Sequence, residues 1–153
     1  MSLDPLIQFS NYAQAFEVAL VTDDWQPVGQ YFTEDATVEV DSKLFGSHTQ
    51  GRENILAYFR RSVERFDRRF DSREPLELSA PTLKDGGVYF PWIVTYRRKN
   101  LPPLELKGEE WDWYQDGLIA RHLERLSNEQ EVADWMAEYG KQLRPHSGSA
   151  AAV

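Results

Sequence analysis

The sequence predicts an α+β domain, with helices mainly in the first half of the chain and strands mainly in the second. In residues 5–70, apolar residues recur at steps of three and four, which is the period of amphipathic helices. In residues 75–126, apolar and polar residues alternate, which is typical of strands with two different faces. Because the two patterns are separated along the chain rather than interleaved, the sequence favours an α+β architecture with an antiparallel sheet.

The size and charge of the chain limit its class. Its 153 residues suit one ordinary domain, and we expect this domain at residues 1–143, followed by a flexible, small and polar tail at 144–153. A formal net charge of −8 argues against a nucleic-acid partner. No apolar run approaches the roughly 18 residues of a membrane span, and residues 1–8 lack the features of a secretion signal. We therefore expect a cytoplasmic protein with no membrane partner.

The chain contains no cysteine, which excludes disulfides, thiolate catalysis and thiolate metal sites. Its histidines, His48, His122 and His146, are far apart and show no metal-ligand spacing. The sequence therefore predicts neither a metal nor an organic cofactor.

The first half of the chain carries the predicted helices. The first helix covers residues 5–22, with Asp4 as its N-cap and a proline in its first turn. A short helix is expected at 25–32, and a short strand at 36–40, where β-formers are concentrated. A loop follows at 41–50. In chain order, the remaining predicted elements are a third helix from Gly51 to Phe66 or Phe70, strands from Pro75 onward, a hairpin turn at 85–87, a strand at 88–98, a turn at 100–103, a hairpin at 104–126, and a last helix from Ser127 or Asn128 to Tyr139.

The hairpin at 104–126 is the stretch around which the chain is organised, because acidic, aromatic and histidine side chains alternate along it. A two-residue turn at Asp116-Gly117 would mix ionisable and apolar side chains on each face. A three-residue loop at 115–117, ending in a left-handed glycine bulge, would separate them and place Glu110 opposite His122. We favour this loop. One face then carries Glu110, Asp112, Tyr114, His122 and Glu124, and the other carries Trp111, Trp113, Ile119 and Leu123.

Two interpretations of the ionisable face remain open. If only the apolar face is buried, the ionisable face is a solvated surface, as alternating charged residues usually are. If the sheet is curved and covered on both sides, the ionisable face lines a pocket and the apolar face meets another subunit.

Three segments resemble the nuclear transport factor 2-like superfamily: YFTEDATVEV from Tyr31, GRENILAYFRR from Gly51 and GEEWDWYQDGLIARHLE from Gly108. The resemblance covers roughly residues 8–128 and is greatest to SnoaL-like polyketide cyclases and ketosteroid isomerase. It implies a cone, in which a strongly curved mixed sheet is closed by three helices around a deep pocket. The C-terminal helix is additional. The outer sheet face often forms a dimer in this superfamily, which implies a homodimer through Trp111 and Trp113 here.

The same resemblance implies that this chain is not a typical ketosteroid isomerase. The proton-abstracting aspartate of that enzyme falls on Val40, and its two oxyanion-site tyrosines fall on Phe16 and Phe59. Only the buried acid that donates to the oxyanion has a counterpart, which is Glu110. Isomerisation of a steroid through that set of groups is therefore not expected.

A pocket lined by the ionisable face would perturb the pKa values of its groups, so that one acid stays protonated and one base stays free near neutral pH. We assign His122 as the base or proton shuttle, Glu124 as its orienting partner or an alternative base, and Glu110 as the acid, with Asp112 nearer the rim. His48 is a further candidate at the pocket mouth. The expected walls for a small hydrophobic molecule are Tyr12, Phe16, Tyr31, Val40, Phe59, Phe90 and Trp92.

Two functions follow from these residues. One is a cofactor-independent lyase, isomerase or hydrolase that acts on a small hydrophobic metabolite by acid–base catalysis. The other is a non-catalytic module for ligand binding or dimerisation, which the superfamily fold also serves. In the second case, His122 is a satisfied buried polar residue and the aromatic side chains are only core.

Overall fold

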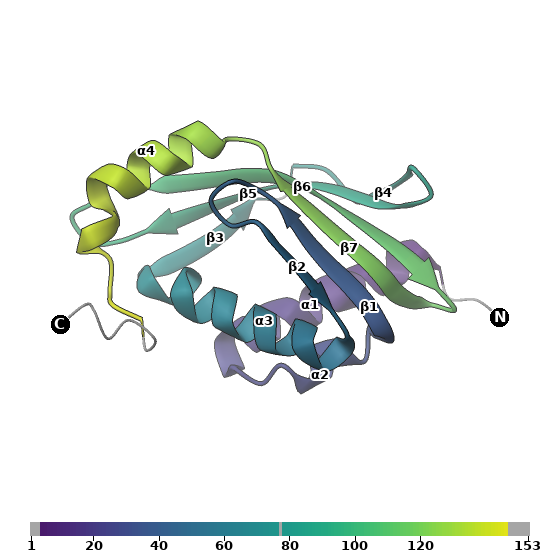
Figure 1. Cartoon of the computed structure of the whole chain (residues 1–153). Coiled ribbons are helices and arrows are strands. Elements are labelled where there is room, and N and C mark those ends of the chain that lie inside the picture. Colours follow the sequence, from purple (N-terminus) through teal and green to yellow (C-terminus); the bar gives the residue numbers. More distant parts are fainter. Residues whose placement is uncertain (1–3, 77, 147–153) are drawn as a thin grey trace.

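The computed structural model of the chain describes residues 4–76 and 78–146. Its helices and strands follow one another in the predicted order, with helices first, then strands, then a final helix (Figure 1). In chain order, the elements are α1 (Pro5–Thr22), α2 (Gln26–Gly29), β1 (Phe32–Asp41), β2 (Ser47–Gln50), α3 (Arg52–Arg65), the 3₁₀ turn η1 (Asp67–Arg69), β3 (Ser72–Leu76), β4 (Thr82–Lys84), β5 (Gly87–Arg97), β6 (Leu104–Gln115), β7 (Leu118–Leu126), α4 (Glu129–Tyr139) and the 3₁₀ turn η2 (Gly140–Gln142).

A single curved sheet joins the described strands in the order β2-β1-β7-β6-β5-β3, with β4 also paired to β5. Strand β1 runs parallel to β7, and the other pairs are antiparallel. Helices α1, α2 and α3 lie on one side of the sheet, and α4 lies at the end opposite the β6–β7 turn (Figure 1). The predicted α+β fold, with a curved mixed sheet and helices from the first half of the chain, is therefore confirmed.

The N-terminal helix follows the prediction closely, because its cap is encoded locally. The Leu6 N–H donates to Asp4 Oδ1 at 2.9 Å, which satisfies one of the free amide groups of the first turn. The second helix is shorter than predicted and ends at Gly29. Strand β1 begins already at Phe32, whose fully buried ring faces the core and whose backbone pairs with β7. The predicted strand at 36–40 was therefore too short.

The prediction of a loop across 41–50 was wrong at its end, where β2 pairs with β1. The β2 sequence, Ser-His-Thr-Gln, alternates between half-buried and exposed positions but contains no apolar residue. Strand β3 was also missed in part, since it begins at Ser72 rather than Pro75. Neither strand carries the apolar alternation by which a strand is predicted.

The central hairpin has a tighter turn than predicted. Asp116 and Gly117 both have positive φ angles, of 51° and 82°, as a two-residue turn requires. The extra residue lies further along, at Ala120, because Tyr114 pairs with Ile119 while Trp113 pairs with Arg121. The predicted three-residue loop was therefore wrong.

This bulge preserves the predicted separation of the two faces but changes the partners across the strands. Glu110 lies opposite Glu124, and Asp112 lies opposite His122. The prediction paired Glu110 with His122, so its register was wrong by two residues along β7. Ile119 precedes the bulge and therefore lies on the inner face. It is fully buried, whereas the prediction placed it on the outer face.

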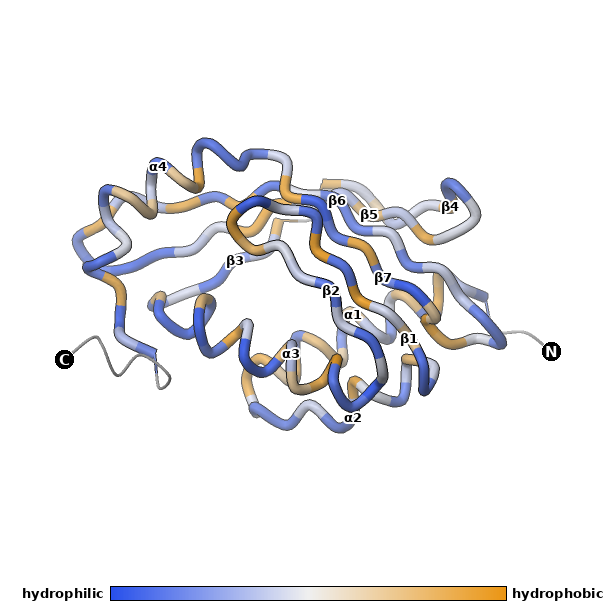
Figure 2. Tube along the Cα trace, viewed as in Figure 1, coloured by the Kyte–Doolittle hydropathy of each residue, from blue (hydrophilic) through white to orange (hydrophobic). Residues whose placement is uncertain are grey.

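Apolar side chains gather in two clusters at opposite ends of the fold. Hydrophobic and hydrophilic segments alternate along β1 and β7 (Figure 2), as expected for strands with one covered face. One cluster joins α1, α2, α3, β1 and the start of β7, around Phe32 and Ile119. The other joins α4 to β5 and β6, around Tyr96 and Trp135. Between them, the inner face is left for the site.

The end of the described chain is tied to the domain. The Arg144 N–H donates to the Arg69 carbonyl at 3.2 Å, and its guanidinium donates to the Phe70 carbonyl at 2.8 Å. Most of the predicted tail, residues 147–153, lies outside the described residues. None of the described helices is both long enough and apolar enough to cross a membrane.

Candidate functional site

A cavity of about 870 Å³ lies between the inner face of the sheet and helices α1 and α3. Tyr31 does not line it. The Tyr31 ring packs against the core next to Tyr12, with ring centroids 6.3 Å apart, and its contact with a ligand stays a prediction. His48, from β2, lines the cavity as predicted. The other predicted wall residues also line it: Tyr12, Phe16, Val40, Phe59, Phe90 and Trp92.

The place of Trp92 depends on a glycine of the neighbouring strand. Trp92 lies across the β5–β6 pair from Gly108, and a Cβ atom at position 108 would lie 2.4 Å from Cζ2 of the indole. Any side chain there would displace the ring. Gly108 therefore allows the indole to lie flat on the sheet and to form one wall of the cavity.

Four ionisable side chains form what we call the His122 cluster: Glu110 and Asp112 from β6, and His122 and Glu124 from β7. His122 is its centre. Its Nδ1 lies 2.7 Å from Asp112 Oδ1, and its Nε2 lies 3.2 Å from Glu124 Oε1. Glu110 Oε2 lies 3.6 Å from the same Nδ1. The period of two along each strand brings all four onto the inner face.

The members of the His122 cluster differ in their exposure. Asp112 is fully buried, and the side chains of His122, Glu110 and Glu124 are 1%, 12% and 35% exposed. The predicted place of Asp112 near the rim was therefore wrong. It lies behind His122, which is itself covered by the rings of Tyr12 and Phe59, at 6.2 and 6.4 Å between centroids. The other three members line the cavity, and Glu124 is the most accessible.

Burial and mutual charge set the protonation of this cluster. Burial alone would lower the pKa of His122, but the neighbouring Asp112 and Glu110 carboxyl groups outweigh it and raise that pKa well above its usual value. Burial, and then the charge of Asp112, raise the pKa of Glu110 well above its usual value. Both shifts favour the protonated forms, which are the imidazolium of His122 and the neutral carboxylic acid of Glu110.

Three buried polar atoms of this region have no hydrogen-bond partner among the described residues: Glu110 Oε2, Asp112 Oδ2 and the Tyr114 hydroxyl. A buried polar atom without a partner is costly, by about 1–3 kcal/mol. The proton of Glu110 removes part of this cost, because a protonated carboxyl group is a donor as well as an acceptor. The unpartnered oxygen of Glu110 faces the His122 ring, at 3.6 Å from Nδ1.

Glu110, Asp112 and His122 could also converge on a metal ion, since one donor atom from each lies within 4.8 Å of the others. The separation of Asp112 Oδ1 and His122 Nδ1, 2.7 Å, is that of a charge-assisted hydrogen bond. Two ligands of one tetrahedral zinc ion would lie roughly 3.3 Å apart, because each is about 2.0–2.1 Å from the metal. The pair would have to separate to admit an ion, so its geometry fits a shared proton better.

A second polar group in the same cavity was not predicted from the sequence. We call Glu17, Asp67, Arg73 and Tyr96 the Arg73 cluster. The Tyr96 hydroxyl donates to Asp67 Oδ2 at 2.8 Å, and Arg73 Nε lies 3.2 Å from the same oxygen. Arg73 Nη1 donates to both carboxylate oxygens of Glu17, each at 2.9 Å. These residues come from four separate elements, so no spacing in the sequence indicates that they meet.

The two clusters share one cavity and influence each other. Burial raises the pKa of Asp67, although the charge of Arg73 and the Tyr96 hydrogen bond oppose this effect. The charge of Glu124 adds to the rise, so Glu124 is close enough to be felt at Asp67. Members of both polar clusters therefore line the same cavity as the aromatic side chains.

The tryptophans Trp111 and Trp113 lie on the outer face of the sheet, as predicted, but neighbours from the same chain cover them. Trp111 is only 8% exposed and packs against the Tyr89 ring at 5.1 Å between centroids. The Arg121 guanidinium lies 4.6 Å from the centre of the Trp113 ring. A homodimer through this face stays a prediction.

Comparison with known proteins gives relatives in structure only. No protein-family model matches the sequence, and no curated protein matches it. An NTF2-like protein from Anabaena variabilis ATCC 29413 is similar in structure, with a TM-score of 0.66 and 18% identity over 83% of this chain and 92% of that one. A protein with a ketosteroid isomerase-like fold from Catenulispora acidiphila DSM 44928, solved with trimethylamine, has a TM-score of 0.60 and 15% identity over 81% and 91%.

A proposed SnoaL-like polyketide cyclase from Shewanella denitrificans OS-217 has a TM-score of 0.61 and 13% identity, over 86% of this chain and 98% of that chain. At these identities, the likeness concerns the fold alone. The fold of the chain is that of the nuclear transport factor 2-like, ketosteroid isomerase-like and SnoaL-like proteins, as the sequence resemblance implied.

Proposed function

We propose that this nuclear transport factor 2-like fold serves an enzyme of the isomerase or cyclase type, which moves a proton on a small hydrophobic carbonyl compound. One observation carries the proposal. Glu110 and Glu124 lie directly opposite each other on β6 and β7, both reach the cavity, and burial raises the pKa of Glu110 well above its usual value. Directly opposite residues of an antiparallel pair have Cβ atoms about 5 Å apart, so both carboxyl groups can touch one carbonyl unit.

Glu124 is the base of the proposed reaction. Its side chain is the most exposed of the His122 cluster, and its Oε1 accepts a hydrogen bond from His122 Nε2. This bond holds one carboxylate oxygen in place and leaves the other for the substrate. His122 was the first candidate for the base, but its pKa is raised and both of its ring nitrogens face carboxylates. We therefore assign His122 as the positioning cation behind Glu124.

Glu110 is the acid. Its proton lies on a carboxyl group that burial and Asp112 keep neutral, and its Oε2 has no partner among the described residues. A neutral carboxylic acid can donate to an oxygen that becomes negative during the reaction, in a site with little water. Asp112 stays behind as the counter-ion of His122 and does not touch the cavity.

The proposed step conserves protons. Glu124 takes a proton from a carbon next to the substrate carbonyl, the C–H electron pair becomes the C=C bond of an enol, and Glu110 gives its proton to the carbonyl oxygen. Return of both protons completes the turnover, at the same carbon or at one conjugated with it. Exchange of that carbon-bound proton with solvent is the simplest sign of the reaction.

The test uses 2-tetralone and related benzo-fused ketones in D₂O, with deuterium incorporation followed by NMR. We expect exchange by the unmodified protein above the rate in buffer, and a loss of about 10²- to 10⁴-fold in Glu124→Gln and Glu110→Gln. Glu109→Gln is the matched control. Glu109 is next to Glu110 but lies on the outer face, where it accepts from the Tyr89 hydroxyl at 2.7 Å. The control should keep the full rate.

Two results would contradict the proposal. If Glu124→Gln exchanges as fast as Glu109→Gln, Glu124 is not the base. If the unmodified protein binds these ketones but does not accelerate the exchange, the protein is instead a non-catalytic module that binds small ligands.

A further inference from the structure

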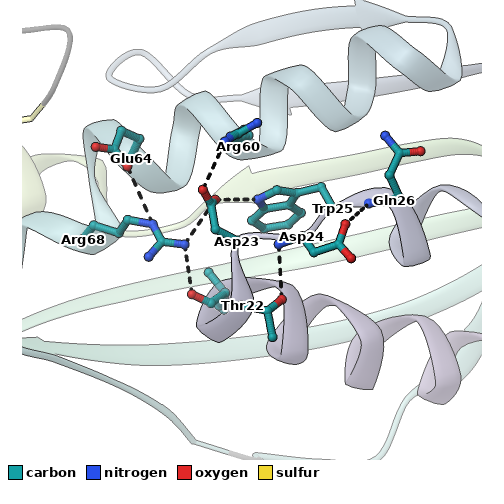
Figure 3. A network of polar contacts seen from close by, with 9 residues as sticks. Thr22, Asp23, Asp24, Trp25, Gln26, Arg60, Glu64 and Arg68 are labelled. Atoms are coloured by element: carbon teal, nitrogen blue, oxygen red, sulfur yellow. Dashed lines mark hydrogen bonds and ion pairs between the residues drawn. The ribbon is translucent and has the colours of Figure 1, made fainter.

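Four arginines of the second half of α3 and the following turn η1 have two kinds of surroundings. Arg60 and Arg68 turn towards the loop after α1, where both pair with Asp23 at 3.3 Å, and Arg68 also lies 3.7 Å from Glu64 (Figure 3). The same aspartate accepts from the Trp25 indole at 3.1 Å. These arginines are therefore held in place, and their role is to fix α1 to α3.

Arg61 and Arg65 are different. They are one turn apart on α3, both are exposed, and both line the cavity together with Ser62. Neither has a carboxylate oxygen within 4.0 Å among residues 4–76 and 78–146. Two neighbouring guanidinium groups that no carboxylate of the described residues occupies are able to bind an anionic group together.

The acidic groups near this opening do not supply that anion. Glu17 and Asp67 line the cavity as well, but both are bound to Arg73. Exposed His48, from β2, also lines the cavity. The mouth of the cavity therefore carries an excess of positive charge, while the negative groups of the His122 cluster lie further in.

The length of the cavity along α3 sets the size of the ligand. Phe59 packs against His122, with centroids 6.4 Å apart, and Arg65 follows six residues later on the same helix. Six residues of an α-helix rise roughly 9 Å. Aromatic walls fill the interval, including Phe16 and Trp92. A ligand that touches both ends thus needs a flat apolar body about as long as two fused rings.

We infer that the cavity takes an amphipathic anion, with its apolar body between the aromatic walls and a carboxylate, sulfonate or similar group at Arg61 and Arg65. This inference builds on the proposed function, because it names the substrate class of the same cavity. The carbonyl compound would carry an acidic group at the end away from Glu124. The binding of the anion does not depend on whether Glu124 moves a proton, so the two proposals can fail separately.

The test compares two fluorescent probes that differ by one anionic group, 8-anilino-1-naphthalenesulfonate and neutral N-phenyl-1-naphthylamine. We expect Arg61→Gln/Arg65→Gln to weaken sulfonate binding about fivefold at low salt, since two exposed ion pairs contribute roughly 0.5 kcal/mol each. The affinity of the neutral probe should not change. Arg60→Gln is the matched control, because Arg60 is next to Arg61 but pairs with Asp23. In the unmodified protein, salt should weaken the binding of the sulfonate only.

Ser62→Trp tests the place of binding, because Ser62 lines the cavity between the two arginines. With the fold checked by circular dichroism, this variant should bind both probes at least tenfold more weakly. The inference is overturned if both probes bind the Ser62→Trp variant normally, since they then lie outside the cavity. It is also overturned if the double arginine variant keeps the full affinity for the sulfonate. A failure of proton exchange with unchanged probe selectivity would contradict only the proposed reaction.

Discussion

Two buried ion pairs face the same cavity, and they are built differently. In the His122 cluster, the cation is an imidazolium, its partner Asp112 is fully buried, and the two atoms lie 2.7 Å apart. In the Arg73 cluster, the cation is a guanidinium, the side chains of Arg73 and Asp67 are 21% and 17% exposed, and the distance is 3.2 Å. The His122–Asp112 pair is thus the more buried and the shorter of the two, and its cation is the one that can lose its proton.

This difference separates two tasks within one cavity. Arginine stays charged at every physiological pH, so the Arg73 cluster is a fixed charge that can only position groups. Histidine can change its charge, and in the His122 cluster its protonation is coupled to three carboxyl groups. Proton chemistry is therefore expected at one side of the cavity and permanent electrostatics at the other.

Removing the cation from each pair gives the largest expected effect. His122→Leu leaves Asp112 buried and uncompensated, and loss of one partner of a buried ion pair costs about 3–5 kcal/mol. Arg73→Met should lower the free energy of unfolding by less, about 1–2 kcal/mol, because water still reaches the remaining carboxylates. Urea unfolding at pH 7 measures both.

A double variant checks the cause of this loss. When Asp112→Asn accompanies His122→Leu, no buried charge remains, and most of the lost stability should return. Equal losses in the single and the double variant would mean that the packing of the imidazole, and not the charge of Asp112, is what His122 contributes.

The pH dependence of stability should separate the two pairs next. The folded state raises the pKa of His122 above the unfolded value near 6.5, so the folded protein binds the extra proton between these two values. This contribution is complete below pH 6.5 and disappears as the pH rises through the folded pKa. The free energy of unfolding should therefore fall above pH 6.5, by at most about 1.4 kcal/mol per pH unit.

Glu110 should also make the free energy of unfolding fall as the pH rises, but from a lower pH. The reason is that its folded pKa is raised above an unfolded value near 4.3. The decline above pH 6.5 should disappear in His122→Gln, and the decline that starts near pH 4.5 should weaken in Glu110→Gln. Arg73→Met should keep the slope between pH 6.5 and 9, because arginine does not titrate there. If Arg73→Met instead removes the fall of the free energy of unfolding between pH 6.5 and 9, the titrating group belongs to the Arg73 cluster and not to the His122 cluster.

The contrast between the clusters also shows what the sequence could predict. Alternation along 104–126 was enough to place Glu110, His122 and Glu124 on one face. An error of two residues in the strand register keeps every side chain on its face, whereas an error of one residue would move it to the other face. The actual partners depended on a bulge at Ala120, and alanine gives no signal for a bulge. The burial of Asp112 depended on α1 and α3, whose positions over the sheet no local pattern specifies.

The Arg73 cluster could not be predicted for a stronger reason. Asp67 and Arg73 occur in a stretch of mixed charges, which indicates a solvated surface, and Glu17 is a single charged residue in the predicted first helix. Only the fold brings them to Tyr96 of β5. Local periodicity thus describes a cluster built on one hairpin and misses a cluster assembled from four distant elements.

The smallest expected effect comes from two tyrosines that make the same bond in different surroundings. The Tyr96 hydroxyl donates to Asp67 at 2.8 Å inside the cavity, and the Tyr89 hydroxyl donates to Glu109 at 2.7 Å on the outer face. Tyr96→Phe leaves a partly buried carboxylate with one donor fewer and should cost about 1–2 kcal/mol, whereas water can replace the hydroxyl in Tyr89→Phe, at about 0.5 kcal/mol or less. Urea unfolding of the two variants measures the difference. Equal costs would mean that Asp67 is as well hydrated as Glu109, and the Arg73 cluster would then be a surface feature rather than a wall of the cavity.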